Sequence, residues 1–514
     1  MFGPFKKERP VQGLTGLGGG AGGYLVAGGV GPGITATGGD ATNTYVADDG
    51  TAYKCHIFTT SGSLVVSDVG GQGAECEFVV VGGGGGAANQ HSGGGGAGGY
   101  RSSVVGELSG GPESSLTNVN NNITWSDHVS VTAGSPSGFD KPAANMFTGN
   151  LDNGTRLMTT GNAVTVTLDM SPTGAGPVTI DAGGQVVLYA ERSSPNPAVT
   201  YPSTASVTVD GVTTPSPAKV VHTWTFPTGG TLTSMSCVND SPGGRTYMEG
   251  MAVNGYMLVN GQPNTSNGIG GGAEDVQVLT ATTYPVTIGA GGAGSTPGPN
   301  GGSPRGSYGG YSEFSGTTPI RALGGGGSGN WSSAGTLRPG NPGGSGGGTS
   351  SHTPGGYAGA DGTIGQGYAG GAGSPGPLAH IGGGGGGASE AGEAGAGTDS
   401  SDCTGGGGGT GRGTLIAGPP TFTTYGTPGP GTGRYFAGGG GSGYYNPTNP
   451  TGIGEGGAGG GASGLQGPTP ADGVDGTVNT GGGGGGSIDF SAGEGGAGGP
   501  GIVMLRYKIS PAQL

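Results

Sequence analysis

Residues that could do chemistry are few in this chain and stand apart from one another. The four cysteines, Cys55, Cys76, Cys237 and Cys403, have neither the spacing of a metal site nor that of a disulfide framework. We therefore expect free thiols, as in a chain made in a reducing cytosol, with no metal and no cofactor. The six histidines are also isolated, and we expect them to be packing or surface residues: His56, His91, His128, His222, His352 and His380.

Two apparent catalytic motifs arise from glycine content alone. Gly343–Gly347 reads Gly-Gly-Ser-Gly-Gly, which fits a nucleophile elbow, but no strand precedes it and no helix follows. The GxGxxG matches likewise lack a βαβ context. The pairs Asp48/Asp49 and Asp472/Asp475 could contact calcium, but acidic residues in turns usually serve the turn itself. The sequence predicts no catalytic residue and a protein that is not an enzyme.

Glycine is the dominant feature, with 136 glycines in 514 residues, against a usual share of about 7%. Placing glycine in ordinary helices or strands costs roughly 0.5–1 kcal/mol each. Over the whole chain this is on the order of a hundred kcal/mol, far above the roughly 5–15 kcal/mol net stability of a domain. The glycines are therefore either flexible linker or part of a structure that only glycine can form.

The glycines gather in short runs, many of which border apolar, strand-like pieces such as Tyr284–Ile288 and Ile502–Ile509. Flexible linker remains open, because Gly/Ser-rich tracts usually behave as coil. The alternative is polyglycine II, an extended helix with three residues per turn whose backbone groups bond neighbouring helices. Collagen is excluded because the strict Gly-X-Y period is absent. The runs are Gly82–Gly86, Gly93–Gly99, Gly324–Gly327, Gly382–Gly387, Gly405–Gly409, Gly438–Gly441 and Gly481–Gly486.

A polyglycine II bundle predicts its own pattern of substitution. An inner helix must be glycine on every face, whereas an outer helix can carry Ala or Ser on its free face. Gly382–Gly387, Gly405–Gly409 and Gly481–Gly486 suit inner positions, and Gly454–Gly464 and Gly493–Gly501 suit outer ones. A six-residue run spans about 19 Å. We expect a short slab with loops at both ends.

The fold class predicted is mostly β and irregular, with a polyglycine II bundle, a small β-layer and an inserted antiparallel β-sandwich. Residues 1–42 read as an extended arm, with Phe2, Phe5, Lys6 and Lys7 as candidate anchors for attachment to a partner; a disordered leader stays open. Residues 43–106 hold three expected strands, with turns at Asp49-Gly50 and Ser61-Gly62, and the first glycine runs.

The segment 107–265 has a different texture, without three consecutive glycines. Short strand-like segments divided by turn signals predict the inserted sandwich there. The expected core aromatics are Trp125, Trp224, Phe226 and Tyr247. The expected strands are Ala163–Leu168, Gln185–Ala190, Ala205–Val209, Lys219–Phe226, Thr231–Val238 and Met248–Val259.

The glycine-rich domain is expected over residues 266–500, and a closing strand over 501–514. In that strand Val503, Leu505, Tyr507 and Ile509 alternate with Arg506 and Lys508. We expect it to form a β-layer with the early strands. The net charge of −14 argues against nucleic-acid binding.

The order of these segments resembles the glycine-rich tail fibre and tail-tip adhesin proteins of tailed bacteriophages, which carry polyglycine II domains. The resembling residues are His56–Val66, Glu77–Gly86, Gly93–Ser103, Tyr284–Ser295, Gly309–Gly329 and Gly495–Tyr507, so the resemblance covers most of 50–110 and 275–509. The insertion resembles carbohydrate-binding-like sandwiches of marine phage fibres. Short-tip adhesins of this family end at a trimeric fibre, so a homotrimer is one expected assembly, although no attachment domain is matched.

This resemblance implies a virion structural protein, made in the host cytoplasm and exposed on the particle exterior. Its expected partners are other virion proteins, through the N-terminal arm, and a host surface glycan or outer-membrane protein. Aromatic residues between glycine runs could bind that receptor or merely cap the slab. The candidate receptor-binding residues are Tyr425, Tyr435, Tyr444, Tyr445 and Trp331, placed at the end of the slab that the β-layer leaves free.

Three other functions remain open. One is a capsid-attached fibre or decoration protein. Another is an ice-binding protein, which needs a flat, regular face that these uneven loops do not suggest. The third is a glycan-degrading fibre, which needs paired carboxylates in a cleft.

Overall fold

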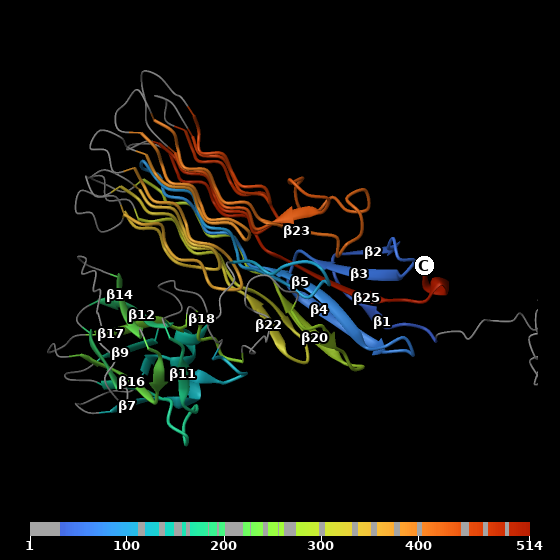
Figure 1. Ribbon diagram of the computed structural model, residues 1–514, viewed down its shortest axis with the longest axis horizontal. Helices are drawn as coiled ribbons and strands as arrows, with labels where there is room; N and C mark the ends of the chain where they lie inside the picture. Colours follow the sequence, from blue (N-terminus) through green and yellow to red (C-terminus); the bar gives the residue numbers. More distant parts are fainter. Residues whose placement is uncertain are drawn as a thin grey trace, which may run out of the picture.

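The computed structural model shows a chain of strands and glycine runs, with no α-helix in the ranges it describes (Figure 1). Short 3-10 turns, such as Trp125–His128, are the helical elements there. The described residues are 31–111, 119–132, 139–148, 157–160, 165–182, 184–192, 195–200, 219–226, 228–239, 245–254, 256–261, 274–297, 304–331, 338–350, 357–374, 381–397, 403–443, 452–465, 471–488 and 493–514.

One end of the glycine region is closed by a sheet in which the first and last strands of that region pair. The closing strand β25 (Ile502–Lys508) lies between β5 (Glu75–Val81) and β3 (Ala52–Phe58), antiparallel to both. The prediction that strands from both ends of the glycine region form a common layer is thus confirmed. The sheet is completed by β2 (Ala41–Val46), β6 (Tyr100–Ser102) and β19 (Gln277–Val278).

A second sheet packs on the first, so the predicted single layer is in fact a two-sheet sandwich. Its order is β1 (Thr35–Thr37), β4 (Gly62–Asp68), β20 (Thr283–Thr287), β21 (Ser312–Ser315) and β22 (Pro319–Ala322). The shared core includes Phe78, Leu505 and Tyr507 from the first sheet and Leu64 and Phe314 from the second. Along β25, Val503, Leu505 and Tyr507 face this core as expected, because successive side chains point to opposite faces. Ile502 and Met504 contact a second apolar cluster on the other face.

Two early predictions need correction. The Asp49-Gly50 turn does join the paired strands β2 and β3, but the chain after Phe58 crosses to the other sheet, so β4 does not pair with β3. The segment before residue 43 also contributes to the core, since Ile34 is buried and β1 pairs with β4. An exposed arm could therefore comprise at most the residues before this strand.

Glycine runs continue directly from the strands of this sandwich (Figure 1). The central run, Gly82–Gly86, follows β5, and its successive N–H groups donate to three different neighbouring runs before the order of partners repeats. The N···O distances are 2.8 to 3.0 Å. The pairs are Gly82 to Gly99, Gly83 to Gly310, Gly84 to Gly499, Gly85 to Gly96, Gly86 to Ser307 and Ala87 to Gly496. The hydrogen bonding therefore has a period of three residues.

Three further runs donate to carbonyl groups of the central run, which gives it six hydrogen-bonded neighbours, three accepting and three donating. The donors are Gly292 and Ser295, Gly325 and Ser328, and Gly484. The run Gly382–Gly387 is enclosed in the same way. Backbone packs on backbone here, because a Cβ atom added at Gly384 would lie 1.9 Å from the carbonyl oxygen of Gly407.

Two of the three runs expected to be inner, Gly382–Gly387 and Gly481–Gly486, are buried throughout. In the third, Gly405–Gly409, Gly408 is only partly buried. In the outer run 493–501 the non-glycine residues Glu494, Ala497 and Pro500 recur every third position and are its more exposed ones. The segment Gly454–Gly464, however, is two short runs joined by a turn in which Gly459 and Gly460 have positive φ of 106° and 91°.

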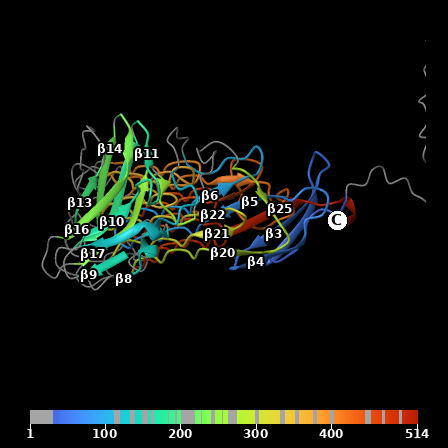
Figure 2. The ribbon, with the colours of Figure 1, turned by 90° about the horizontal axis from the view of Figure 1, so that it is seen from below.

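The segment between residues 119 and 261 forms sheets around its own apolar core, seen beside the glycine runs in Figures 1 and 2. Trp125, Trp224 and Phe226 are buried in that core, as predicted. One sheet has the order β13 (Pro195–Thr200), β16 (Ser234–Asn239), β10 (Thr165–Asp169) and β7 (Val129–Thr132). The other has β14 (Lys219–Phe226), β12 (Gly184–Arg192), β17 (Arg245–Val253), β9 (Leu157–Thr160) and β8 (Phe139–Lys141), with β18 (Tyr256–Met257) on β17.

A small two-stranded sheet completes this part, formed by β11 (Val178–Ile180) and β15 (Gly230–Leu232). The expected strand 219–226 is β14, and the expected strand 231–238 is divided between β15 and β16. The expected strand Ala205–Val209 and the side chain of Tyr247 lie outside the described residues. A small apolar contact joins this region to the glycine runs, with Ala252, Met257 and Val259 against Leu323.

Candidate functional site

The predicted receptor-binding aromatics do not form one cluster. Tyr425 and Tyr435 lie in the 411–437 loop, which packs on the sandwich at the strand end of the glycine runs (Figure 1). Trp331 lies at the opposite, distal end, where its backbone N–H donates to the carbonyl oxygen of Gln90 at 3.2 Å. The prediction that the free end carries all of them is wrong for the first two residues. Tyr444, Tyr445, Phe2, Phe5, Lys6 and Lys7 lie outside the described residues.

Tyr425 is largely a structural residue of this loop. Its side chain packs against the core cluster on the outer face of the first sheet, next to buried Phe436 and Ile416. The guanidinium of Arg434 donates to the Tyr425 carbonyl oxygen at 2.9 Å and also to Gly426. The ring therefore belongs to the cap over the sheet.

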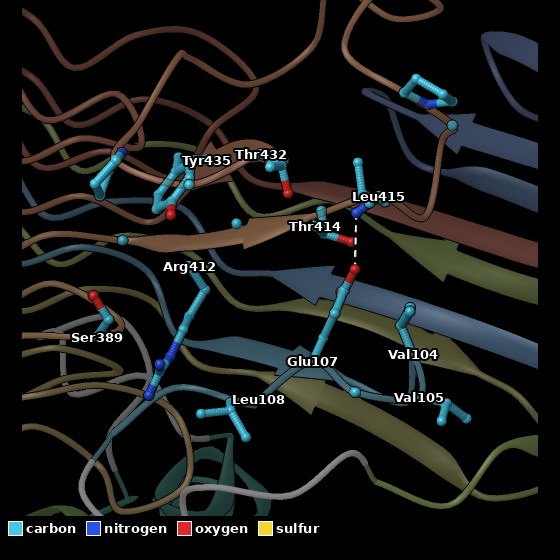
Figure 3. A pocket seen from close by; sticks show the side chains of 18 of the residues that line it. Val104, Val105, Glu107, Leu108, Ser389, Arg412, Thr414, Leu415, Thr432 and Tyr435 are labelled. Atoms are coloured by element: carbon cyan, nitrogen blue, oxygen red, sulfur yellow. Dashed lines mark hydrogen bonds between the residues drawn. The ribbon is translucent and has the colours of Figure 1, made fainter. Parts of the chain in front are cut away.

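Tyr435 lines a cavity of about 680 Å³, which we call the strand-end pocket (Figure 3). It stands on β24 (Arg434–Phe436), paired with β23 (Arg412–Thr414). Glycines pack along its side chain, since a Cβ at Gly429 would lie 2.3 Å from the ring and one at Gly431 2.5 Å from the hydroxyl. The hairpin thus fixes Tyr435 as a wall of the pocket.

Six separate stretches of the chain line the pocket. The pocket is lined by Tyr45, Val105, Glu107, Leu108, Ser389, Glu390, Arg412, Thr414, Leu415, Thr432 and Arg506, among others. Arg506 is held in place by Glu77, at 2.6 Å, and by the Tyr45 hydroxyl, at 2.7 Å. Burial raises the pKa of Tyr45 to about 12, against the opposing charge of Arg506, so this hydroxyl stays protonated at neutral pH.

Two charged side chains of opposite sign face the pocket without pairing. Glu107 accepts a hydrogen bond from the Leu415 N–H at 2.8 Å, and burial raises the pKa of its carboxyl group. Arg412 points away from Glu107, past Leu108 (Figure 3). Its Nε is buried and has no hydrogen-bond partner within the described part of the chain. The pocket therefore offers a donor group on one side and a carboxyl group on another.

Apolar side chains form the rim of the pocket. Val105 is 83% exposed, and Leu415 and Leu108 are also exposed. Large exposed apolar residues beside a cavity are typical of surfaces that contact another molecule.

The distal end carries a buried polar turn. The central run ends in Ala87–Ser92, and Asn89 and Gln90 are fully buried there. Asn330 donates to the Asn89 side-chain oxygen at 3.2 Å and accepts from the Gln90 N–H at 3.1 Å. Trp331 follows this residue directly, so it is anchored to the tip of the central run.

Sequence reasoning missed Glu107, Arg412 and Ser389 as site residues. Glu107 lies far from Ser389 and Arg412 in the sequence, and no motif links the three. The only available signal was the adjacency of Arg412 to a glycine run and an aromatic loop.

The described ranges of the chain include no apolar helix of membrane-spanning length. No three His, Cys, Asp or Glu residues of those ranges are grouped as metal ligands. The acids once considered for calcium, Asp472 and Asp475, instead accept the N–H groups of Glu494 and Ala497, at 2.9 and 2.7 Å. These two pairs are also spaced by three residues.

Comparison with known proteins links part of the chain to a family. Residues 273–508 match the family model described as a glycine-rich domain. This match begins after the inserted sandwich and ends with the last residue of β25. No curated protein and no solved structure matches the chain significantly.

Proposed function

We propose that the glycine runs are polyglycine II helices in a hexagonal bundle. The support is the three-residue hydrogen-bond period and the six neighbours of the central run. Polyglycine II has three residues per turn and no internal hydrogen bonds, so each backbone group must bond a neighbour. Such a bundle is held by its backbone and leaves the connecting loops free to vary.

On this scaffold we propose a non-enzymatic virion structural protein, a tail fibre or tail-tip adhesin of a tailed bacteriophage. The observation that carries the proposal is the division of the bundle into two unlike ends. The strands close one end, and the distal end gathers the turns, including Trp331 on the tip of the central run. Loops on a rigid scaffold suit recognition of a variable surface. We therefore assign host receptor binding to the distal loops.

Attachment to the particle is assigned to the N-terminal segment with Phe2, Phe5, Lys6 and Lys7. The test is a chain that lacks residues 1–30. The deletion should go no further, because Ile34 belongs to the core of the two-sheet sandwich. The shortened chain should remain folded and fail to join particles. Normal incorporation of the shortened chain would remove this assignment.

Receptor binding is tested by replacing Tyr444 and Tyr445 with Ser on particles. The sequence places them directly after Gly443, whose N–H donates to the Ser92 carbonyl oxygen at the distal end. Adsorption to host cells should fall while the melting temperature stays constant. The matched control is Phe422→Ser, an exposed aromatic at the strand end, which should leave adsorption unchanged. Loss of adsorption in the control alone would contradict the assignment to the distal end.

A further inference from the structure

We propose that the strand-end pocket binds a saccharide unit that carries a carboxylate. This site goes beyond the proposed receptor-binding function, which uses the distal loops. At about 680 Å³ the pocket falls in the usual range of ligand sites. It is also built on a strand hairpin packed against a core, so its walls are held in place.

Arg412 carries the argument for the carboxylate. Three other arginines of the two-sheet sandwich each pair with a carboxylate. Arg101 pairs with Glu274 at 2.5 Å, Arg321 with Glu313 at 2.6 Å and Arg506 with Glu77 at 2.6 Å. In a chain with 31 acidic and 17 basic residues, a carboxylate partner is easy to supply. Arg412 nevertheless has no carboxylate within ion-pair distance in the described part of the chain.

The unsatisfied Nε of Arg412 favours a ligand that brings acceptor oxygens. A buried donor without a partner costs free energy that a bound acceptor recovers. The planar guanidinium matches a carboxylate with two parallel hydrogen bonds, which a single hydroxyl cannot make. An anionic group is therefore the best complement to this side of the pocket.

The remaining lining favours a sugar over a simple anion. Thr432 presents a hydroxyl group, and the Ser389 hydroxyl oxygen can still accept a hydrogen bond, because its O–H donates to the Thr410 carbonyl oxygen at 2.9 Å. Glu107 presents a carboxyl group beside Leu415 (Figure 3). Such mixed donors and acceptors suit ring hydroxyls, while Val105 and Leu415 offer apolar contact to the C–H faces of a sugar. Asp48 and Glu390 also line the pocket, and their carboxylates would repel a polyanion, which favours a ligand with one charge.

The test compares two sugars that differ only in the charged group. The full chain is titrated with methyl β-D-glucuronide and with methyl β-D-glucoside, and binding is followed by saturation-transfer NMR. The glucuronide should bind more tightly. Arg412→Gln should weaken glucuronide binding by about tenfold or more and remove the preference, and Arg412→Lys should fall between.

The control is Lys54→Gln, which removes the same charge. Lys54 lies on β3 in register with Tyr507, on the opposite face of the sheet from the pocket, so glucuronide binding should be unchanged. If Arg412→Gln does not fold, Thr432→Trp at the exposed rim should block binding instead. Equal affinity for the two sugars, no binding of either, or full binding by the Arg412 variant would each overturn the proposal. The purified chain and free sugar are used, so failure of the adsorption experiment leaves this result independent.

Discussion

The glycine bundle and the inserted sandwich solve the same packing problem in opposite ways. In the inserted sandwich, Trp125, Trp224 and Phe226 fill a core between sheets. In the bundle there is no side chain to bury, and backbones approach so closely that a Cβ at Gly83 would lie 2.0 Å from the carbonyl oxygen of Ala290. The sandwich is therefore specified by which apolar side chains are present, and the bundle by which side chains are missing.

This difference predicts different tolerance to substitution. Apolar cores accept replacement by residues of similar volume, because neighbouring side chains can adjust. A backbone carbonyl in a hydrogen-bonded bundle cannot move without breaking its own bond and those of its neighbours. The most destabilising substitutions should therefore be those that add side-chain atoms in the bundle and those that remove side-chain atoms in the inserted sandwich.

The largest effect is expected for Gly384→Val. The added side chain would occupy the space of the Gly407 carbonyl, 1.9 Å from the new Cβ. We expect a loss of more than about 4 kcal/mol in unfolding free energy, measured by denaturant titration. The matched control is Gly452→Ser, whose nearest neighbour is the Thr404 methyl group at 3.2 Å, and it should change stability little. Equal, small losses in both variants would indicate flexible linker.

The next largest loss of stability is expected for Phe226→Ala in the inserted sandwich. Removing this buried ring leaves a cavity and should cost about 3–5 kcal/mol. Leu188→Met, a swap of similar volume in the same core, should cost below about 1.5 kcal/mol. Calorimetry should show the Phe226 loss in one transition and the glycine bundle melting as before. A uniform shift of the whole profile would show that the two regions unfold together.

The smallest effect is a pH dependence from His56. This side chain is buried between the Gly38 carbonyl, at 2.7 Å from Nδ1, and the Tyr507 hydroxyl, at 2.9 Å from Nε2. Burial lowers its pKa, so below about pH 6.5 the unfolded chain takes up a proton that the folded chain does not. The contribution of His56 to the free energy of unfolding is therefore complete above about pH 6.5 and decreases as the pH falls.

The variant His56→Gln keeps polar atoms at the site and removes the titrating ring. The difference in unfolding free energy between the natural chain and this variant should shrink from pH 7.5 to pH 5. A constant difference across that range would contradict the buried neutral histidine.

Much of the backbone arrangement could be predicted from sequence, because glycine texture and strand alternation are local. The free face of the 493–501 run and the two faces of β25 follow directly from residue spacing. The sheet to which β4 belongs could not be predicted, because a strand shows the same alternation of apolar residues in either sheet.

The candidate site was harder to predict than the fold. The end of the bundle at which a loop emerges depends on how many runs precede it. The glycines of 357–374 are interrupted by other residues, so the sequence does not mark this segment as a separate run, and the 411–437 loop was predicted at the wrong end. The role of Arg412 depends on the absence of a carboxylate nearby in space, which spacing along the chain does not reveal.

The most direct test of the account is an alanine scan of the outer run 471–478, read by thermal melting. Here glycine recurs at every third position, and Cβ atoms at Gly473 and Gly476 would lie 2.3 Å from the Gly496 nitrogen and 2.4 Å from the Gly482 carbonyl oxygen. Val474 is exposed to solvent on the same run. Gly473→Ala and Gly476→Ala should each lower the melting temperature clearly, and Val474→Ala and Thr477→Ala should not. A flat profile across these four variants would contradict a bundle packed with three residues per turn.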